Sequence, residues 1–323
     1  MDRISFILGS GLALSVATVP LHAETAYVSN ERGASVTVID LAKGAPTATW
    51  PVGKRPRGIT LSRDGKYLLV CAGDDNAVEV RDRATGALIA TLPSGADPEQ
   101  CFASRDGHLL FVANENDAAM TAIDLSTRKV AWQAVVGKEP EGIAESPDGK
   151  WLVVTSEDDS SIAWIDLATH QAVDTTVTEA RPRHVEFTAD GRELWIAAEA
   201  GQVVQIADPA TRRIIATIPF APPGVASYKV LPCGIRFTPD GKTAVIALGR
   251  ADSVAVIDVA SRKVRGYVAV GRRPWHLAIT GDGKSAIVAN GLSNNVSLVD
   301  LAALKVTATL PAGEGPWGVV IAP

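Results

Sequence analysis

The sequence predicts an all-β fold made of stacked repeats, and three recurring features support that prediction. Asp-Gly pairs begin at Asp64, Asp106, Asp148, Asp190, Asp240 and Asp282, so their spacings are 42, 42, 42, 50 and 42 residues. An aspartate closes an apolar run at Asp40, Asp82, Asp124, Asp166, Asp208, Asp258 and Asp300. A proline recurs at Pro56, Pro98, Pro140, Pro182, Pro232, Pro274 and Pro316. Self-similarity at a fixed period of this length is the signature of stacked structural units.

Each repeat contains four short β-rich runs separated by turn residues. Residues 58–95 show them as "GITLS", "YLLVCAG", "AVEVRD" and "ALIATLPSG". Asp-Gly suits a tight hairpin because glycine accepts a positive φ and aspartate can accept a hydrogen bond from its own backbone. We expect the aspartate that closes the third run to cap the following turn in the same way. Helical periodicity is absent, so each repeat is predicted to be one four-stranded blade of a β-propeller.

The two ends of the chain supply the parts of one further blade. Residues 317–323, "WGVVIAP", match a first strand, and residues 25–40, "TAYVSNERGASVTVID", match a second and a third strand. Pairing them would close the ring and remove its free sheet edges. The prediction is a single domain over residues 24–323, a seven-bladed propeller with four antiparallel strands per blade.

Eight extra residues interrupt the repeat between Pro219 and Pro232. They fall in the loop between the fourth and fifth complete blades, where they lengthen a surface loop and leave the strand register untouched. The face that carries this loop is called the insertion face below, and the face that carries the Asp-Gly turns is called the turn face. Tyr228 and Lys229 of the insertion offer an aromatic anchor and a charge to a partner. The alternative is a neutral surface insertion.

Residues 1–23 are predicted to be a secretory signal peptide. Arg3 and the amino terminus precede an apolar stretch from Ile4 to Val19, and Ala23 is a small residue suited to a cleavage site. We therefore expect a periplasmic protein, cleaved near Ala23. An uncleaved membrane anchor is less favoured because the stretch is short and rich in glycine and serine.

Charge and cysteine usage narrow the classes of function. The net charge is −5 and there is no basic tail, which gives no reason to expect nucleic-acid binding. The three cysteines, Cys71, Cys101 and Cys233, form no C-x-x-C pair. One disulfide remains open in an oxidising compartment, and burial as small apolar side chains is the simpler expectation.

Comparing the repeats with one another separates structural residues from candidate functional ones. A residue found in most blades serves the blade, and a departure is a candidate. Departures cluster just after the recurring proline, at the start of each predicted inner strand. They are Arg57, Glu141, Arg183, Trp275 and Trp317 in the first slot, His184 and His276 in the next, and Glu186 and Arg236 two slots further on.

These side chains are predicted to reach the central channel near one mouth. Glu186 and Arg236 occupy matching slots of neighbouring blades, so we expect them to form a buried ion pair. The cluster is either a ligand or metal site, or a set of hydrogen bonds and ion pairs that fills a wet channel. A metal is disfavoured because the histidines and the carboxylate come from separate blades without short ligand spacing.

Charge on the insertion face is sorted by blade. Acidic residues dominate in the first three blades and basic residues in blades four to six. Such sorting suits docking of an oppositely patterned protein, since complementary fields steer encounter. A solvated face with scattered charge is the alternative.

The repeats resemble the YVTN-type β-propellers, whose motif stands here as "YVSN" at 27–30 and "IVANG" at 287–291. "CGIRFTPDGKTAVIALGRADSVAVIDV" at 233–259 and "VGRRPWHLAI" at 270–279, together with the proline-rich insertion, resemble one subgroup. These are the exported propellers associated with PQQ-dependent alcohol catabolism. The resemblance covers the whole mature chain. It implies a role beside a periplasmic quinoprotein dehydrogenase or its cytochrome partner, and it supplies no catalytic motif.

Three functions follow as hypotheses. The first is a non-enzymatic exported binding or accessory protein of quinoprotein alcohol oxidation. The second is a carrier for PQQ or a haem-like cofactor, because the cationic slots with Trp275 and Trp317 suit an anionic aromatic compound. The third is a lactonase-type hydrolase of the kind in which carboxylates and an asparagine surround a channel metal. Arginine mixed with glutamate in the inner slots opposes a dication and counts against this third hypothesis.

Overall fold

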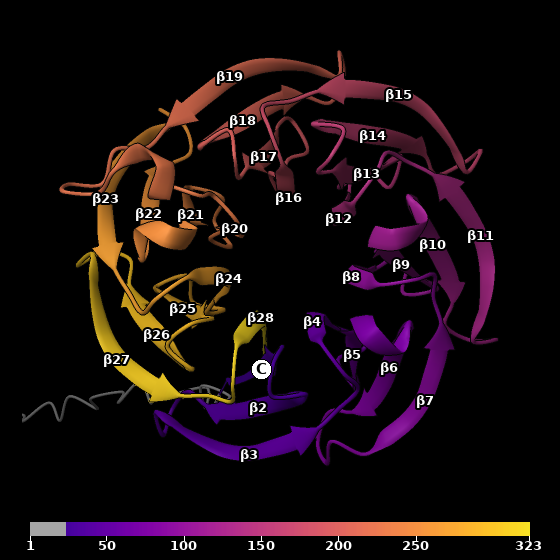
Figure 1. Cartoon of the computed structure of the whole chain (residues 1–323), viewed down its shortest axis with the longest axis horizontal. Helices are drawn as coiled ribbons and strands as arrows, with labels where there is room; N and C mark the ends of the chain where they lie inside the picture. The colour runs from indigo at the N-terminus through magenta and orange to yellow at the C-terminus, as the bar shows by residue number, and fades with distance from the viewer. Residues whose placement is uncertain (1–23) are drawn as a thin grey trace, which may run out of the picture.

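The computed structural model describes residues 24–323, which form seven four-stranded antiparallel sheets around a central axis (Figure 1). The predicted seven-bladed propeller is therefore confirmed. Residues 1–23, where the signal peptide was predicted, lie outside the described residues. No helix in the described part of the chain is long and apolar enough to cross a membrane.

The first strand of each blade lines the channel (Figure 1). These inner strands are β4 (Pro56–Leu61), β8 (Pro98–Ala103), β12 (Pro140–Glu145), β16 (Pro182–Phe187), β20 (Ile235–Phe237), β24 (Pro274–Ile279) and β28 (Pro316–Ala322). The second strands are β1 (Thr25–Asn30), β5 (Tyr67–Ala72), β9 (Leu109–Asn114), β13 (Trp151–Ser156), β17 (Leu194–Ala198), β21 (Thr243–Ala247) and β25 (Ser285–Asn290).

The third and fourth strands complete each blade outward to the rim. The third strands are β2 (Ser35–Asp40), β6 (Ala77–Asp82), β10 (Ala119–Asp124), β14 (Ser161–Asp166), β18 (Val203–Asp208), β22 (Ser253–Asp258) and β26 (Asn295–Asp300). The rim strands are β3 (Ala45–Pro51), β7 (Leu88–Pro93), β11 (Lys129–Val135), β15 (Gln171–Val177), β19 (Arg213–Pro219), β23 (Lys263–Ala269) and β27 (Lys305–Pro311). Short 3-10 helices are η1 (Gly73–Asp75), η2 (Glu115–Asp117), η3 (Ser227–Lys229) and η4 (Gly249–Ala251).

The last blade is built from both ends of the chain. β28 pairs antiparallel with β1, which places Val319 opposite Val28 and Ala322 opposite Thr25. The sheet order β28-β1-β2-β3 confirms the predicted closure, and the yellow β28 lies beside the indigo strands in Figure 1. This pairing covers the edge of β1 that would otherwise be left without hydrogen-bond partners.

The repeated aspartates act through local hydrogen bonds. In the first complete blade, Asp64 Oδ1 accepts the Lys66 N–H at 3.1 Å, while Gly65 adopts a φ of 69°. Asp82 Oδ1 accepts the N–H groups of Ala84 and Thr85 at 3.1 and 2.8 Å, which confirms the predicted cap on the following turn. These contacts explain why both aspartates recur in most blades.

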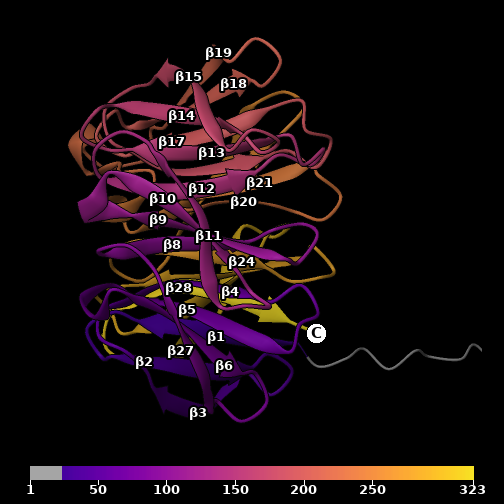
Figure 2. The ribbon, with the colours of Figure 1, turned by 90° about the vertical axis from the view of Figure 1, so that its right-hand side faces the viewer.

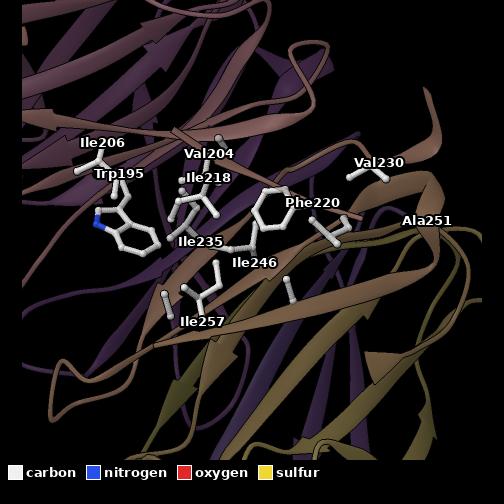
Figure 3. Close-up of a cluster of buried hydrophobic side chains, with 14 residues drawn as sticks. Trp195, Val204, Ile206, Ile218, Phe220, Val230, Ile235, Ile246, Ala251 and Ile257 are labelled. Carbon is white, nitrogen blue, oxygen red and sulfur yellow. The ribbon is translucent and has the colours of Figure 1, made fainter. Parts of the chain in front are cut away.

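Apolar side chains fill the space between neighbouring blades. Figure 3 shows Trp195 and Ile206 of the fourth complete blade packed with Ile235, Ile246 and Ile257 of the fifth. A fully buried isoleucine contributes about 1.5–3 kcal/mol relative to an exposed one, so each seam of this kind holds adjacent blades in register.

The insertion is anchored at both ends. Phe220 and Val230 are buried in the seam of Figure 3, beside Ala251 of η4, whereas Tyr228 between them is 68% exposed. The middle of the loop is therefore presented to solvent while its ends are part of the core. All three cysteines are buried and free, which agrees with the expectation that they pack as small apolar side chains.

Figure 2 shows the propeller from the side, with the loops of its two faces at opposite edges of the ring. The N–H of Gly73, in η1, donates to the carbonyl of Arg55 at 3.2 Å. Loops between second and third strands therefore share the insertion face with loops between blades. The Asp-Gly turns lie on the opposite, turn face.

Candidate functional site

The insertion-face mouth of the channel is filled by buried ion pairs. Arg183 of β16 lies 3.0 Å from Glu141, 3.0 Å from Glu157 and 2.9 Å from Glu199, and its side chain is only 8% exposed. Arg273 adds a contact of 2.6 Å to Glu199. Two inner strands, two loops that follow second strands and one blade-to-blade loop are thus tied together at this mouth.

A second group of ion pairs continues around the same mouth. Arg57 of β4 lies 2.5 Å from Glu99, and Arg55 lies 2.8 Å from the other oxygen of that carboxylate. Asp97, Glu99 and Glu115 place ligand atoms within 4.8 Å of one another. However, Arg55 pairs with all three and Arg57 with Glu99 and Glu115. Because arginine already neutralises these oxygens, the donor set does not fit the channel metal of the lactonase hypothesis.

Trp275 and Trp317 pack against the arginines of the insertion-face mouth. The guanidinium of Arg273 lies 3.8 Å from the ring centroid of Trp275, and that of Arg183 lies 5.1 Å from it. Trp317 is 1% exposed, and Arg57 lies 5.9 Å from its ring. The aromatic faces that were expected to meet an anionic cofactor are therefore in contact with the protein's own arginines.

The channel opens instead toward the turn face. A cavity of about 230 Å³ is lined by His184, His276, Glu186, Arg236, Arg105 and Glu145, among others. Arg105 belongs to an Asp-Gly turn and is exposed, and Glu186 and Arg236 are each about a third exposed. The ion-paired residues at the insertion-face mouth are buried or half-buried, whereas the cavity lining extends to the exposed Arg105, so we infer that solvent reaches the cavity from the turn face.

Arg236 presents one edge of its guanidinium to this cavity. Its Nη1 donates to Glu186 Oε2 at 2.8 Å and to the carbonyl of Ile235 at 2.8 Å, and it lies 3.0 Å from His184 Nε2. Its Nε and Nη2 donate to no residue in 24–323 and stay accessible to solvent in the cavity. The predicted Glu186–Arg236 pair is confirmed, but the expectation that it is buried is wrong, because its side chains are 31% and 33% exposed.

Both channel histidines are held in the neutral form. The Ile235 N–H points at His184 Nδ1 at 3.3 Å and Arg236 approaches Nε2, so donors face both ring nitrogens. A protonated imidazole would direct an N–H at both of these donors, whereas the neutral ring has one nitrogen that can accept. Burial, reinforced by Arg236, holds the pKa of His184 and that of His276 well below the usual range.

His276 offers an acceptor nitrogen inside the cavity. The Gln100 side-chain amide lies 3.4 Å from His276 Nε2. The neutral ring carries one unprotonated nitrogen, which is the acceptor. The ring packs 4.2 Å from Trp317 and 5.2 Å from His184, centroid to centroid, which fixes its orientation.

Glu145 lines the turn-face end of the cavity. Its carboxylate accepts the Arg105 N–H at 2.8 Å, and burial raises its pKa. Comparison of the repeats singles out Glu145, because its slot is otherwise apolar. Arg105 escapes that comparison, because turn residues vary from blade to blade.

The sequence-predicted residues therefore fall into three places. His184, Glu186, Arg236 and His276 meet in the cavity, whereas Arg57, Glu141, Arg183 and Trp275 lie at or beside the insertion-face mouth. Trp317 lies between the two, because it lines the cavity and also faces Arg57. Tyr228 and Lys229 are exposed on η3 and do not line the cavity.

Comparison with known proteins identifies similar propellers. A family described as "Lactonase, 7-bladed beta-propeller" matches residues 166–310, under half of the chain. No sequence among the curated proteins matches. Among solved structures, a putative 6-phosphogluconolactonase from Bacteroides uniformis is 19% identical with a TM-score of 0.77, covering 93% of this chain and 100% of its own.

Two further solved structures show the same architecture. A putative 6-phosphogluconolactonase from Bacteroides fragilis is 19% identical with a TM-score of 0.76, covering 95% of this chain and 100% of its own. Hydrazine synthase from Kuenenia stuttgartiensis is 24% identical with a TM-score of 0.78, covering 85% of this chain and 92% of its own. Likeness at this identity shows the fold alone. The matches support a β-propeller, and none supports the PQQ-associated subgroup.

Proposed function

We propose that this protein hydrolyses a small cyclic ester in the cavity at the turn-face end of its channel. The observation that carries the proposal is the presence of an acceptor nitrogen, on His276, and a free guanidinium edge, on Arg236, in one cavity. The segment that resembles the lactonase propellers, 166–310, contains both residues together with His184 and Glu186.

The cavity supplies the two groups that ester hydrolysis needs without a metal. The unprotonated ring nitrogen of the neutral His276 accepts a proton from a water molecule as that water attacks the ester carbonyl carbon. The N–H groups of Arg236 stabilise the negative charge that develops on the carbonyl oxygen. The ring C–O bond then breaks, and the imidazolium returns its proton to the departing alkoxide oxygen. Water and a lactone are consumed, and one hydroxy acid is formed.

Burial lowers the pKa of His276, which favours release of its proton to the departing alkoxide. Because its pKa is lowered, the ring is unprotonated at neutral pH and its protonated form gives up the proton readily. The same shift makes it a weak base, so the attack depends on Arg236 to lower the energy of the oxyanion. Glu186 and His184 hold Arg236 in place for that role.

The test is acid release from γ-butyrolactone and δ-valerolactone, followed with a pH indicator. Wild-type protein is expected to hydrolyse at least one of them faster than buffer, and His276→Gln to lose roughly 10²–10⁴-fold, the usual contribution of general acid–base catalysis. His108→Gln is the matched control, because His108 is exposed in a turn. A wild-type rate equal to buffer, or a His276→Gln rate equal to wild type, would overturn the proposal.

A second candidate is an exported accessory protein that binds a partner through its insertion face. The exposed Tyr228, on a loop whose ends are anchored in the core, favours it, because an anchored loop loses less entropy on binding. The sequence resemblance would make that partner a quinoprotein dehydrogenase or its cytochrome. Shortening 222–229 would then weaken partner binding while leaving lactone hydrolysis unchanged.

A further inference from the structure

We propose that the channel cavity is a carboxylate-binding site, in which the Nε–Nη2 edge of Arg236 binds a small hydroxy monocarboxylate side-on. That the hydroxy acid is the ring-opened product of a lactone rests on the proposed function. The carboxylate site itself rests on the surroundings of Arg236.

The geometry of Arg236 divides its donors into two groups. Nη1 is used within the protein, by Glu186, by the Ile235 carbonyl and by the contact with His184. Those contacts fix the plane of the guanidinium and leave the parallel N–H groups of Nε and Nη2 facing the cavity. Two parallel donors on a planar group match the two oxygens of a carboxylate, which is the geometry of strong bidentate binding.

Charge in the cavity disfavours a dianion relative to a monoanion. Arg105 and Arg236 contribute two positive charges, and Glu145 and Glu186 contribute two negative charges. The histidines of the lining add none, because they are neutral. One carboxylate therefore leaves a single net negative charge beside a free arginine edge, whereas a phosphate dianion would leave two in a half-buried space, where uncompensated charge is costly.

The size of the cavity limits the rest of the ligand. At about 230 Å³ it lies below the roughly 300–1,000 Å³ of pockets that take drug-sized ligands. Beyond Arg236, the walls offer Gln100 and His276 to a hydroxyl group and Phe102 and Ile143 to a short carbon chain. A short hydroxy acid fits this combination.

If the cavity binds a carboxylate in this way, the hydroxy acid that hydrolysis produces should stay bound to Arg236. A lactone is neutral, so it gains only single hydrogen bonds from Arg236 before the reaction. Ring opening creates a carboxylate at the carbonyl carbon, where the arginine edge already lies. The hydroxy acid should therefore bind more tightly than the lactone and inhibit the reaction competitively.

The experiment measures binding without turnover, by isothermal titration calorimetry with 4-hydroxybutyrate, 1,4-butanediol and inorganic phosphate. Wild-type protein is expected to bind 4-hydroxybutyrate at least tenfold more tightly than either of the others. Arg236→Lys keeps the charge and removes the parallel donors, so it should weaken that binding at least tenfold. Arg250→Lys is the control, because Arg250 is exposed on the insertion face.

A second variant tests the same site without touching Arg236. Glu186→Gln removes the counter-charge, so it should tighten binding of 4-hydroxybutyrate severalfold. The proposal is overturned if wild-type protein fails to bind 4-hydroxybutyrate, if phosphate binds as tightly, or if Arg236→Lys binds like wild type. Binding without any lactone hydrolysis would instead reject the proposed function and leave the carboxylate site standing.

Discussion

Replacing Arg183 by methionine should destabilise the propeller more than any change in the channel cavity. The side chain is 8% exposed and contacts Glu141, Glu157 and Glu199 within 3.0 Å. Methionine preserves most of the volume and removes the charge, which leaves Glu141 without a partner, while Glu157 keeps Arg181 and Glu199 keeps Arg273. Breaking a buried ion pair from one side costs about 3–5 kcal/mol, because the remaining charge has no partner. For a domain of this size that corresponds to a fall in melting temperature of about 5–8 °C.

The loss should also depend on pH in a defined direction. Burial already raises the pKa of Glu141 against the charge of Arg183, and removal of Arg183 raises it further. A carboxyl group whose pKa is higher in the folded state than in the unfolded state stabilises the fold below its unfolded pKa of about 4.3. This stabilisation is lost as the pH rises through the pKa of the folded state. Arg183→Met should therefore cost more stability at pH 8 than at pH 5.

The assay is urea unfolding of wild type, Arg183→Met, Glu141→Gln and the double variant at both pH values. The double variant should lose at least about 1 kcal/mol less than the sum of the single losses, because the two residues are coupled. Glu186→Gln provides the contrast, since its pair with Arg236 is a third exposed and should cost about 1 kcal/mol or less. Additive losses, or a smaller loss at pH 8 than at pH 5, would refute this account of the mouth.

Two further predictions concern closure and acid stability. Deleting residues 317–323 removes most of β28 and leaves β1 as a free edge, so calorimetry should show a lower and less cooperative transition; an unchanged transition would contradict the closure. His184 is neutral in the folded state with its pKa well below 6.5. As pH falls below 6.5, the unfolded chain alone takes up that proton, and stability should fall by about 1.4 kcal/mol per pH unit. His184→Gln should show a slope shallower by that amount, and an equal slope would show that His184 is protonated when folded.

Repetition is what made the fold predictable from the sequence. The hydrogen bonds of Asp64 and Asp82 are local, so their effect can be inferred from neighbouring residues alone. The closure by 317–323 and 25–40 followed because each end matches a known part of the repeat. The Glu186–Arg236 pair followed from equal slots in neighbouring blades, and its distance of 2.8 Å bears this out.

The direction in which loop residues point was beyond that reasoning. Glu157 and Glu199 follow second strands and could be read only as charges of the insertion face, yet they turn inward to Arg183. Arg105 reaches the cavity from a turn and pairs through its backbone with Glu145, 40 residues away. Whether a loop side chain faces solvent or the axis depends on the curvature of the whole ring, which no single repeat encodes. The sequence therefore predicted a cluster near one mouth of the channel, and the structure places the cavity toward the turn face.

A crystal structure of the protein grown with 4-hydroxybutyrate would test the central claim most directly. The account predicts density in the channel, with the carboxylate against Nε and Nη2 of Arg236 and the hydroxyl near His276. Density at the insertion face beside Tyr228, or an unchanged cavity at a ligand concentration that saturates binding in solution, would contradict it.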